Sequence, residues 1–172
     1  MKRNAPNEKL RKILSPFALD ERGETVRVVM TKILLINGAN LNMLGVREPE
    51  KYGVKTLVDI EDMVIARGKE LGVDVDVYQS NIEGEIVEKI QQALGKYDGI
   101  LINAGGYTHT SVVIRDAISA VKIPTIEVHM TNIHAREEFR HTSLLSGVCK
   151  AIVAGFGEKS YLLALEGLIK SL

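Results

Sequence analysis

The stretch "KILLINGANLNMLGVREPEKYGVKTL", Lys32 to Leu57, begins like a buried strand and ends where a helix begins. The letters "KILLIN" are almost all apolar, as in a strand that a parallel sheet covers on both faces. From Leu57 onward, apolar residues recur at helical spacing, at Ile60, Val64 and Leu71. The loop between strand and helix is longer than the roughly 2–6 residues that such a connection needs. We therefore expect this loop to have a function of its own.

The remainder of the chain repeats this alternation of strands and helices. Strands are predicted at 73–79, 99–104, 125–130 and 147–155, and helices at 86–94, 111–121 and 161–172. The segment 132–146, "NIHAREEFRHTSLLS", is predicted to be a loop with a short helix. This order predicts an α/β protein: a flavodoxin-like three-layer sandwich with a five-stranded parallel sheet in the order 2-1-3-4-5.

Composition excludes several classes of protein. Lys+Arg and Asp+Glu are both 22, and this zero net charge argues against nucleic-acid binding. No apolar run approaches the ~18–20 residues that a membrane-spanning helix requires. The single cysteine, Cys149, lies in an apolar run and is predicted to be a small buried hydrophobic residue. One unpaired cysteine suits a reducing cytosol, so a cytoplasmic location is predicted.

Residues 1–29 differ from the rest because their apolar periodicity is weak and they contain Pro6 and Pro16. They are predicted to be a poorly ordered N-terminal extension, followed by a single catalytic α/β domain over residues 30–172. Met30 stands directly before the first strong strand and is a second candidate for the start of the protein. A transit peptide is an alternative, although the acids Asp20 and Glu21 weaken it.

Polar residues gather where the predicted strands end. Asn37 and Asn40 follow the first strand, Asn103 ends the third, and Glu127 and His129 end the fourth. Ligands of open α/β sheets bind outside the carboxyl ends of the strands, so we expect these residues to face one crevice. A histidine at this position, beside an acid, is a candidate general acid or base.

Three further features have both a functional and a simpler interpretation. His109, after the third strand, could join the same crevice or be structural. Arg47 could lower the pKa of Tyr52 on a closing lid and so make a general base, or Tyr52 could simply pack its ring. Arg136 and Arg140 would share one helical face and could bind a carboxylate, although Glu137 and Glu138 could pair with them instead.

Motifs for cofactors and metals are missing. The sequence contains no HExxH or CxxC spacing, no GxGxxG fingerprint and no Walker pattern. We therefore expect neither a cofactor nor a metal.

Five ordered blocks resemble a known family, the type II 3-dehydroquinate dehydratases. They are "LLINGANLNMLGVREPEKYG", "YQSNIEGE", "INAGGYTHTSVVIRDAI", "PTIEVHMTNIHAREEFRHTS" and "YLLALEGL". The resemblance implies a flavodoxin-like fold and a carbon–oxygen hydro-lyase that converts 3-dehydroquinate to 3-dehydroshikimate without cofactor or metal. It also implies a homo-dodecamer built as a tetramer of trimers, acting in the shikimate pathway of aromatic amino-acid biosynthesis or in quinate catabolism.

The same resemblance implies catalytic roles for five residues. Tyr52 resembles the base that removes the proton next to the ketone, and Arg47 resembles the lid residue that keeps Tyr52 ionised. Asn40 resembles the group that holds a water against the enolate oxygen. His129 resembles the acid that protonates the departing hydroxyl, with Glu127 orienting it.

Substrate binding is implied for a second set of residues. Met130 and Thr131 resemble a carboxylate cradle of backbone N–H groups and a hydroxyl, and Asp116 resembles an acid that reaches the site from an adjoining subunit. The full set is Asn103, His109, Asp116, Met130, Thr131, Arg136 and Arg140.

The chain departs from the family pattern at four positions without losing a catalytic group. Ala39 replaces a usual proline, and Thr131 replaces a serine but keeps the hydroxyl. Tyr78 and Ile82 stand where arginine and histidine are common, which puts subunit contacts near them in doubt. Two alternatives remain: a flavodoxin-like module for a flavin or phosphate, which would purify yellow with flavin, and a catalytically inactive homologue, against which the retained groups argue.

Overall fold

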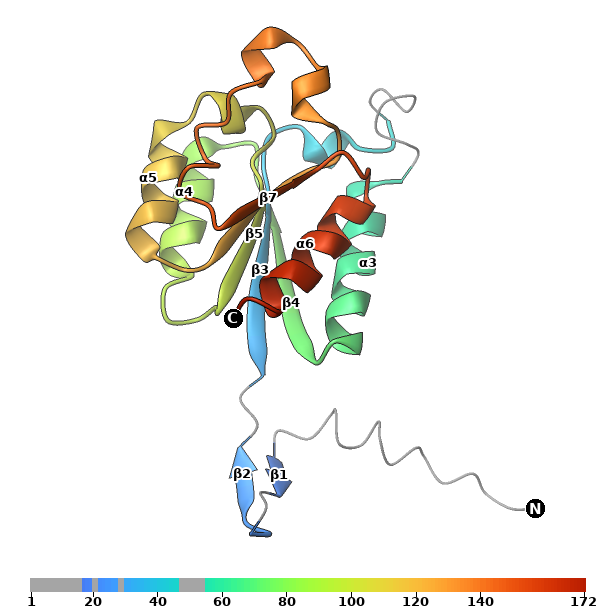
Figure 1. The fold of residues 1–172 in the computed structure, drawn as a ribbon, viewed down its shortest axis with the longest axis vertical. Coiled ribbons are helices and arrows are strands. Elements are labelled where there is room, and N and C mark those ends of the chain that lie inside the picture. Colours follow the sequence, from blue (N-terminus) through green and yellow to red (C-terminus); the bar gives the residue numbers. More distant parts are fainter. Residues whose placement is uncertain (1–16, 20–21, 28–29, 47–54) are drawn as a thin grey trace, which may run out of the picture.

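The computed structural model describes residues 17–19, 22–27, 30–46 and 55–172. Its main body is a five-stranded parallel sheet in the order β4-β3-β5-β6-β7 (Figure 1). The strands are β3 (Thr31–Asn37), β4 (Val73–Gln79), β5 (Gly99–Asn103), β6 (Thr125–His129) and β7 (Ala151–Ala154). Counted within this sheet, the order is 2-1-3-4-5, so the predicted flavodoxin-like architecture is confirmed.

In the described part of the chain, four helices cover the two faces of this sheet. They are α3 (Leu57–Glu70) and α6 (Lys159–Ile169) on one face, and α4 (Glu83–Gln92) and α5 (Val112–Val121) on the other (Figure 1). Successive residues of β3 serve the two cores in turn. Ile33 and Leu35 pack on the α3 and α6 side, and Leu34 and Ile36 pack on the α4 and α5 side. All four are fully buried, which explains why "KILLIN" has no polar alternation.

The N-termini of two helices are fixed by capping side chains. Thr56 and Asp59 form a capping box at α3: the Thr56 hydroxyl accepts from the Asp59 N–H at 3.2 Å, and the Asp59 carboxylate accepts from the Thr56 N–H at 2.8 Å. Ser111 caps α5 by accepting from the Ile114 N–H at 3.0 Å. These caps fix where the chain enters each helix from the carboxyl ends of β3 and β5.

The segment between β6 and β7 differs from its prediction. In place of one short helix it holds two separate 3₁₀ turns, η3 (Ile133–Ala135) and η4 (Glu138–Arg140). Arg136 lies between them in an extended conformation, with φ −113° and ψ −163°. The expectation that Arg136 and Arg140 share a face of one helix is therefore wrong.

Strand β7 is shorter than the predicted 147–155. The N–H groups of Val148 and Cys149 both donate to the Leu145 carbonyl, at 3.0 and 3.1 Å, so this part of the chain turns. The strand begins at Ala151, directly after Lys150, whose N–H donates to the Thr125 carbonyl at 2.8 Å.

The described part of the N-terminal extension contains a small hairpin that the sequence pattern did not predict. Its strands, β1 (Phe17–Leu19) and β2 (Thr25–Arg27), pair antiparallel in a sheet of their own. The division into an extension and a catalytic domain stays a prediction, because residues 1–16, 20–21 and 28–29 lie outside the described residues. Within the described residues, no helix is both long enough and apolar enough to cross a membrane.

Cys149 is half-buried rather than fully buried, and it packs against the core on the α4 and α5 side. Burial, together with the nearby negative charge of Glu127, raises the pKa of the Cys149 thiol to about 12. The thiolate is the reactive form, so this cysteine is expected to be inert near neutral pH.

We predict that Cys149 reacts with a disulfide reagent at pH 8 more than about 100-fold more slowly in the native protein than in urea, since each pKa unit above the pH cuts the thiolate fraction about tenfold. The rate of thiol release under the two conditions measures this. Equal rates would show that the raised pKa and the partial burial do not protect the thiol.

Candidate functional site

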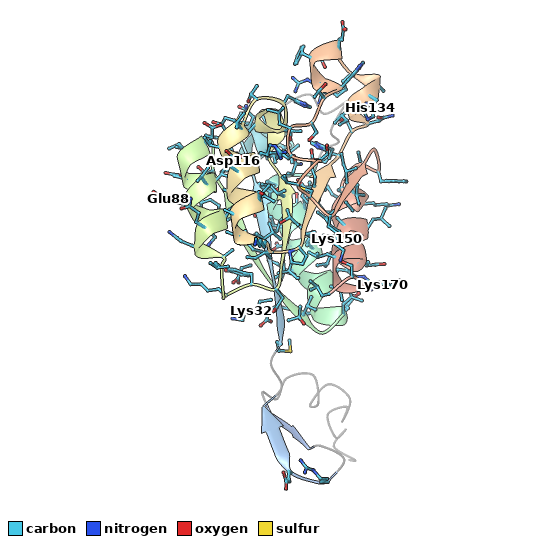
Figure 2. The ribbon with its side chains drawn as sticks, turned by 60° about the vertical axis from the view of Figure 1, so that its left-hand side comes forward. Lys32, Glu88, Asp116, His134, Lys150 and Lys170 are labelled. Atoms are coloured by element: carbon cyan, nitrogen blue, oxygen red, sulfur yellow. The ribbon has the colours of Figure 1, made fainter. Side chains whose placement is uncertain are left out.

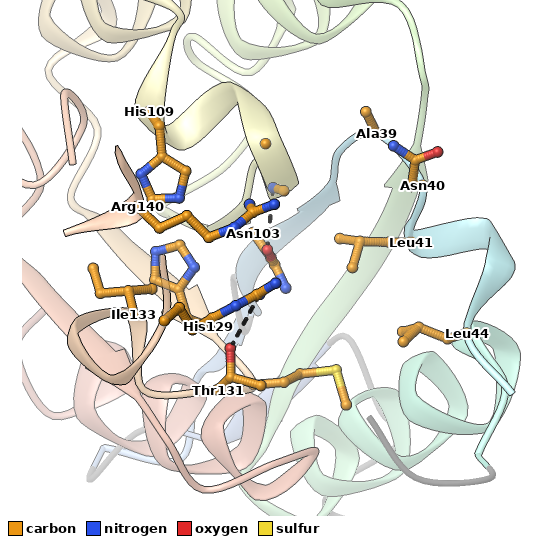
Figure 3. Close-up of a pocket in the computed structure, with 14 residues that line it drawn as sticks. Ala39, Asn40, Leu41, Leu44, Asn103, His109, His129, Thr131, Ile133 and Arg140 are labelled. Atoms are coloured by element: carbon orange, nitrogen blue, oxygen red, sulfur yellow. Dashed lines mark hydrogen bonds between the residues drawn. The ribbon is translucent and has the colours of Figure 1, made fainter. Parts of the chain in front are cut away.

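A cavity opens at the carboxyl ends of β3, β5 and β6 (Figure 3). In Figure 3, His109, Arg140 and His129 lie on one side of it, and Leu41 and Leu44 lie on the other. The residues predicted from the sequence that line it are Asn40, Asn103, His109, His129, Met130, Thr131, Arg136 and Arg140. The predicted crevice is therefore present, and it lies at the predicted edge of the sheet.

Glycines allow the loop after β3 to lie against the end of β5. Gly38 N–H donates to the Asn103 carbonyl at 2.7 Å, and a Cβ at Gly38 would overlap the Ala104 carbonyl. Gly105 has φ +61°, and a Cβ there would lie 2.6 Å from the Ala39 carbonyl oxygen. No other residue type fits either position without moving the backbone. The close approach brings Ala39 and the cavity wall from β5 together.

Asn40 stands at the mouth of the cavity in a left-handed conformation, with φ 68°. Its N–H donates to the Asn81 side-chain oxygen at 2.9 Å, which holds the turn after β3. Asparagine tolerates this conformation better than most residues. The backbone therefore presents the Asn40 side chain at a fixed point.

His129 is held from behind by Glu127. The two residues are two apart on β6 and so lie on the same face of the strand, and the His129 Nε2 is 2.6 Å from Glu127 Oε1. His129 is 6% exposed and lines the cavity, whereas Glu127 is fully buried. The expectation that Glu127 itself faces the crevice is wrong: the carboxylate lies behind the imidazole, where it fixes the ring's orientation and tautomer.

Ser143 completes this arrangement, and the sequence reading did not identify it. Its Oγ lies 2.8 and 2.9 Å from the two Glu127 oxygens and accepts the N–H groups of Leu145 and Ser146, at 3.1 and 3.0 Å. Because two backbone donors occupy its lone pairs, its single proton is directed at Glu127. Ser143 is 16 residues from Glu127, so no local sequence pattern links the two.

Arg136 and Arg140 reach the cavity from one wall, although not from one helix. Glu137 Oε2 lies 3.4 Å from the Arg136 Nε and 3.0 Å from the Arg140 Nε, so one carboxylate serves two guanidiniums. A backbone hydrogen bond first, and then both arginines, lower the pKa of Glu137. Arg136 Nη1 also donates to the Thr131 hydroxyl at 3.5 Å. Two guanidiniums thus lie beside one another on this wall, an arrangement that suits an anion.

His109 and Asn103 are both anchored from outside the cavity. His109 Nδ1 donates to the Thr142 carbonyl at 2.8 Å, which leaves Nε2 as the acceptor nitrogen of the neutral ring. Asn103 is 4% exposed; its Nδ2 donates to the Tyr161 hydroxyl at 2.7 Å, and its Oδ1 accepts from Gly105 N–H at 3.2 Å. The sequence pattern identified Tyr161 only as part of the last helix. Asn37 was expected to face the crevice, but it is fully buried and contacts Tyr161.

Besides Glu127, three predicted site residues are not among the described residues that line this cavity. Arg47 and Tyr52 lie outside the described residues. Asp116 is exposed on α5, outside the set of residues that line the cavity (Figure 2).

The chemistry of the described lining is acid–base and anion-binding. It includes two histidines and two arginines and no carboxylate. Within the described residues, no three or more His, Cys, Asp or Glu side chains gather closely enough to hold a metal ion. The arrangement can bind a small anion and exchange a proton with it through His129.

The sequence of the chain is similar to those of known proteins. The family model described as "Dehydroquinase class II" matches residues 31–169. A protein of Prochlorococcus marinus (strain NATL1A) named 3-dehydroquinate dehydratase is 54% identical over 140 residues, which are 81% of this chain and 97% of that protein. One of the same name from Rhizobium johnstonii is 55% identical over 136 residues, 79% of this chain and 94% of that protein.

Solved structures show the same likeness in three dimensions. The type II dehydroquinase of Butyrivibrio crossotus superimposes with a TM-score of 0.80 and 46% identity, covering 81% of this chain and 98% of that one. The matched span contains every described residue of the cavity. The chain therefore belongs to the dehydroquinase class II family.

Proposed function

We propose that this chain dehydrates 3-dehydroquinate to 3-dehydroshikimate through an enolate. One observation carries the proposal: His129, backed by the buried Glu127, faces the same cavity as the arginine wall. An anionic hydroxy-ketone needs such a combination, because its carboxylate must be held while a hydroxyl leaves as water. The names of the relatives support the same reaction.

The substrate carboxylate would bind where β6 ends. We place it against the backbone N–H groups of Met130 and Thr131 and the Thr131 hydroxyl, with Arg136 and Arg140 supplying positive charge. Both arginines and Thr131 line the cavity, and Arg136 already contacts the Thr131 hydroxyl. Asn103 and His109, each anchored on its outer side, would bind substrate oxygens across the ring.

The first chemical step is removal of the proton next to the ketone. We assign it to Tyr52, with Arg47 stabilising the phenolate. A free tyrosine titrates near pH ~10, so a neighbouring guanidinium is needed to favour the ionised form. The negative charge then moves to the ketone oxygen, where a water held by Asn40 would support the enolate.

The second step expels the hydroxyl. As the enolate collapses, the carbon–oxygen bond breaks and His129 donates a proton to the leaving oxygen, so that water departs. Since Nε2 is engaged with Glu127, the proton would come from Nδ1. Tyr52 ends the cycle protonated and His129 deprotonated, and exchange with solvent restores both.

The reaction is common to aromatic biosynthesis through the shikimate pathway and to quinate catabolism, and we propose that the enzyme serves one of them in the cytoplasm.

The direct test of the proposed dehydration is to add 3-dehydroquinate and follow the absorbance of the conjugated enone product. Turnover without added metal or cofactor is expected. A purified protein that binds flavin and leaves 3-dehydroquinate unchanged would refute the proposal.

Replacing Tyr52 by Phe keeps the ring and removes the proton acceptor. We expect kcat to fall by the ~10²–10⁴ typical of losing a general base, with little change in substrate binding. Arg47→Ala should also lower kcat, and the double variant should be no slower than the worse single one, because both act on one proton transfer.

The pH dependence separates these two roles. Raising the pH should partly restore Arg47→Ala by ionising Tyr52, and it should not restore Tyr52→Phe. If Tyr52→Phe keeps most of its turnover, the tyrosine is a packing residue and His109 becomes the next candidate for the base.

The residues behind His129 allow a graded test. Glu127→Gln removes the charge that faces Nε2 and should lower kcat by about 10² or more. Ser143→Ala removes only the hydroxyl directed at Glu127 and should lower kcat about 10-fold, since a hydrogen bond to a charged group contributes about 1.5–3 kcal/mol. Ser146→Ala is the matched control: its hydroxyl donates to the Ser143 carbonyl at 3.3 Å and does not contact Glu127. Equal losses in the two serine variants would contradict the proposed role of Ser143.

We also propose a homo-oligomer, a dodecamer built as a tetramer of trimers, in which Asp116 approaches the site of a neighbour. Val112 and Val113, near Asp116 on α5, are 57% and 51% exposed in the single chain, which favours contact with another copy.

Sedimentation should show a closed assembly of about twelve chains. Asp116→Ala should lower kcat/KM, whereas Asp74→Ala, at another exposed position, should not. A fully active monomer would refute both the assembly and the role of Asp116.

A further inference from the structure

Four polar side chains form a hydrogen-bonded line from the cavity through the core to helix α3. Asn103 Nδ2 donates to the Tyr161 hydroxyl at 2.7 Å, and that hydroxyl donates to Asn37 Oδ1 at 3.1 Å. Asn37 Nδ2 then donates to Glu61 Oε1 at 2.9 Å. The four come from β5, α6, β3 and α3, and only Asn103 lines the cavity. We call these four residues the Glu61–Asn103 line.

Burying the polar groups of this line has a free-energy cost. Asn37 and Tyr161 are fully buried and Asn103 is 4% exposed. Polar groups at such positions destabilise the fold unless every one is hydrogen-bonded, and a phenylalanine at 161 with an apolar residue at 37 would fill the space without that requirement. Packing alone therefore does not explain why a hydroxyl lies here.

At the Glu61 end of the line, the chemistry of the groups determines which one donates and which one accepts in each hydrogen bond. Burial raises the pKa of Glu61, and the hydrogen bond from Asn37 opposes that rise. In its ionised form this carboxylate can only accept, so Asn37 turns its NH₂ toward Glu61 and its oxygen toward Tyr161. Burial raises the pKa of the Tyr161 hydroxyl, which therefore keeps its proton. That proton points at the Asn37 oxygen, and the oxygen of Tyr161 is left to accept from Asn103.

At the Asn103 end, the hydrogen bonds require the same order of donors and acceptors. Gly105 N–H is a backbone donor that cannot be reversed, and it lies 3.2 Å from Asn103 Oδ1. The Asn103 oxygen must therefore face Gly105, which turns its NH₂ toward Tyr161. A side-chain amide flips at little cost unless its surroundings distinguish the two ends. Here both ends of the line distinguish them.

We propose that Tyr161, supported by Asn37 and Glu61, is a positioning residue that orients the Asn103 amide toward the substrate. One Nδ2 proton of Asn103 is used on Tyr161, and the second is thereby directed into the cavity as a donor to a substrate oxygen. This inference rests on the proposed dehydratase function, in which Asn103 binds the substrate. Tyr161 does not itself touch the substrate.

A double-variant cycle tests the proposal. Tyr161→Phe removes one hydroxyl, and kcat/KM for 3-dehydroquinate should fall about 10-fold or more. In an Asn103→Ala background the same change should lower kcat/KM less than about 2-fold, because the group that Tyr161 orients is gone. A purely structural role would give the same fold-loss in both backgrounds, and that result would overturn the proposal.

The matched control is Tyr97→Phe. Tyr97 also donates through its hydroxyl to a side chain, Asp76 Oδ2 at 2.8 Å, but it lies beside the amino end of β5. Its loss should leave kcat/KM within about 2-fold of wild type. A loss like that of Tyr161→Phe would show that any missing tyrosine hydroxyl lowers activity.

Two fallbacks keep the proposal open to refutation. If Tyr161→Phe does not fold, the cycle is run with Glu61→Ala, which alters the half-buried end of the line, with Asp62→Ala on the same helix as control. If Asn103→Ala has no measurable turnover, the same cycle is measured with the Kd for 3-dehydroquinate in place of kcat/KM. All variants then also carry His129→Ala. An inactive wild type overturns the proposed function and this inference with it; an active wild type with additive losses overturns this inference alone.

Discussion

The site depends on how β3 and β5 diverge at their carboxyl ends. The two strands are neighbours in the sheet, yet the helix that follows β3 packs on one face and the helix that follows β5 packs on the other. The chain cannot leave both strands in opposite directions without opening a gap between the two loops. Gly38 keeps that gap narrow, because its N–H still reaches the Asn103 carbonyl. The cavity is therefore a result of topology, and the polar residues at its wall are placed by it.

Much of this was predictable because parallel sheets bury their strands on both faces. The run "KILLIN" and the later apolar runs predicted the sheet, and the strand-end rule then predicted Asn103 and His129 as neighbours. The pairing of Glu127 with His129 follows from the two-residue period of a strand. The same period did not reveal that Glu127 would lie behind the ring, because the two residues share one face and only contacts in the folded chain decide which of them lines the cavity.

Other parts could not be predicted, since they depend on contacts between distant segments. Ser143 reaches Glu127 from the loop after η4, and Tyr161 reaches Asn103 from the last helix, 58 residues along the chain. Arg136 and Arg140 both line the cavity, but not for the predicted reason: helical spacing suggested the pair, whereas two separate turns bring them there. The base assigned to Tyr52 rests on resemblance, because that residue lies outside the described part of the chain.

The sharing of Glu137 between two guanidiniums determines how an anion meets this surface. The two guanidiniums are concentrated on this wall, while the formal net charge of the whole chain is zero. Salt screens this local charge beyond about one Debye length, roughly 8 Å at physiological ionic strength, and a zero net charge adds no longer-range attraction. An anion therefore approaches by ordinary diffusion, without long-range steering, and is drawn in only at the mouth. Capture at this site should accordingly depend less on salt than it does in proteins whose whole surface attracts their ligand.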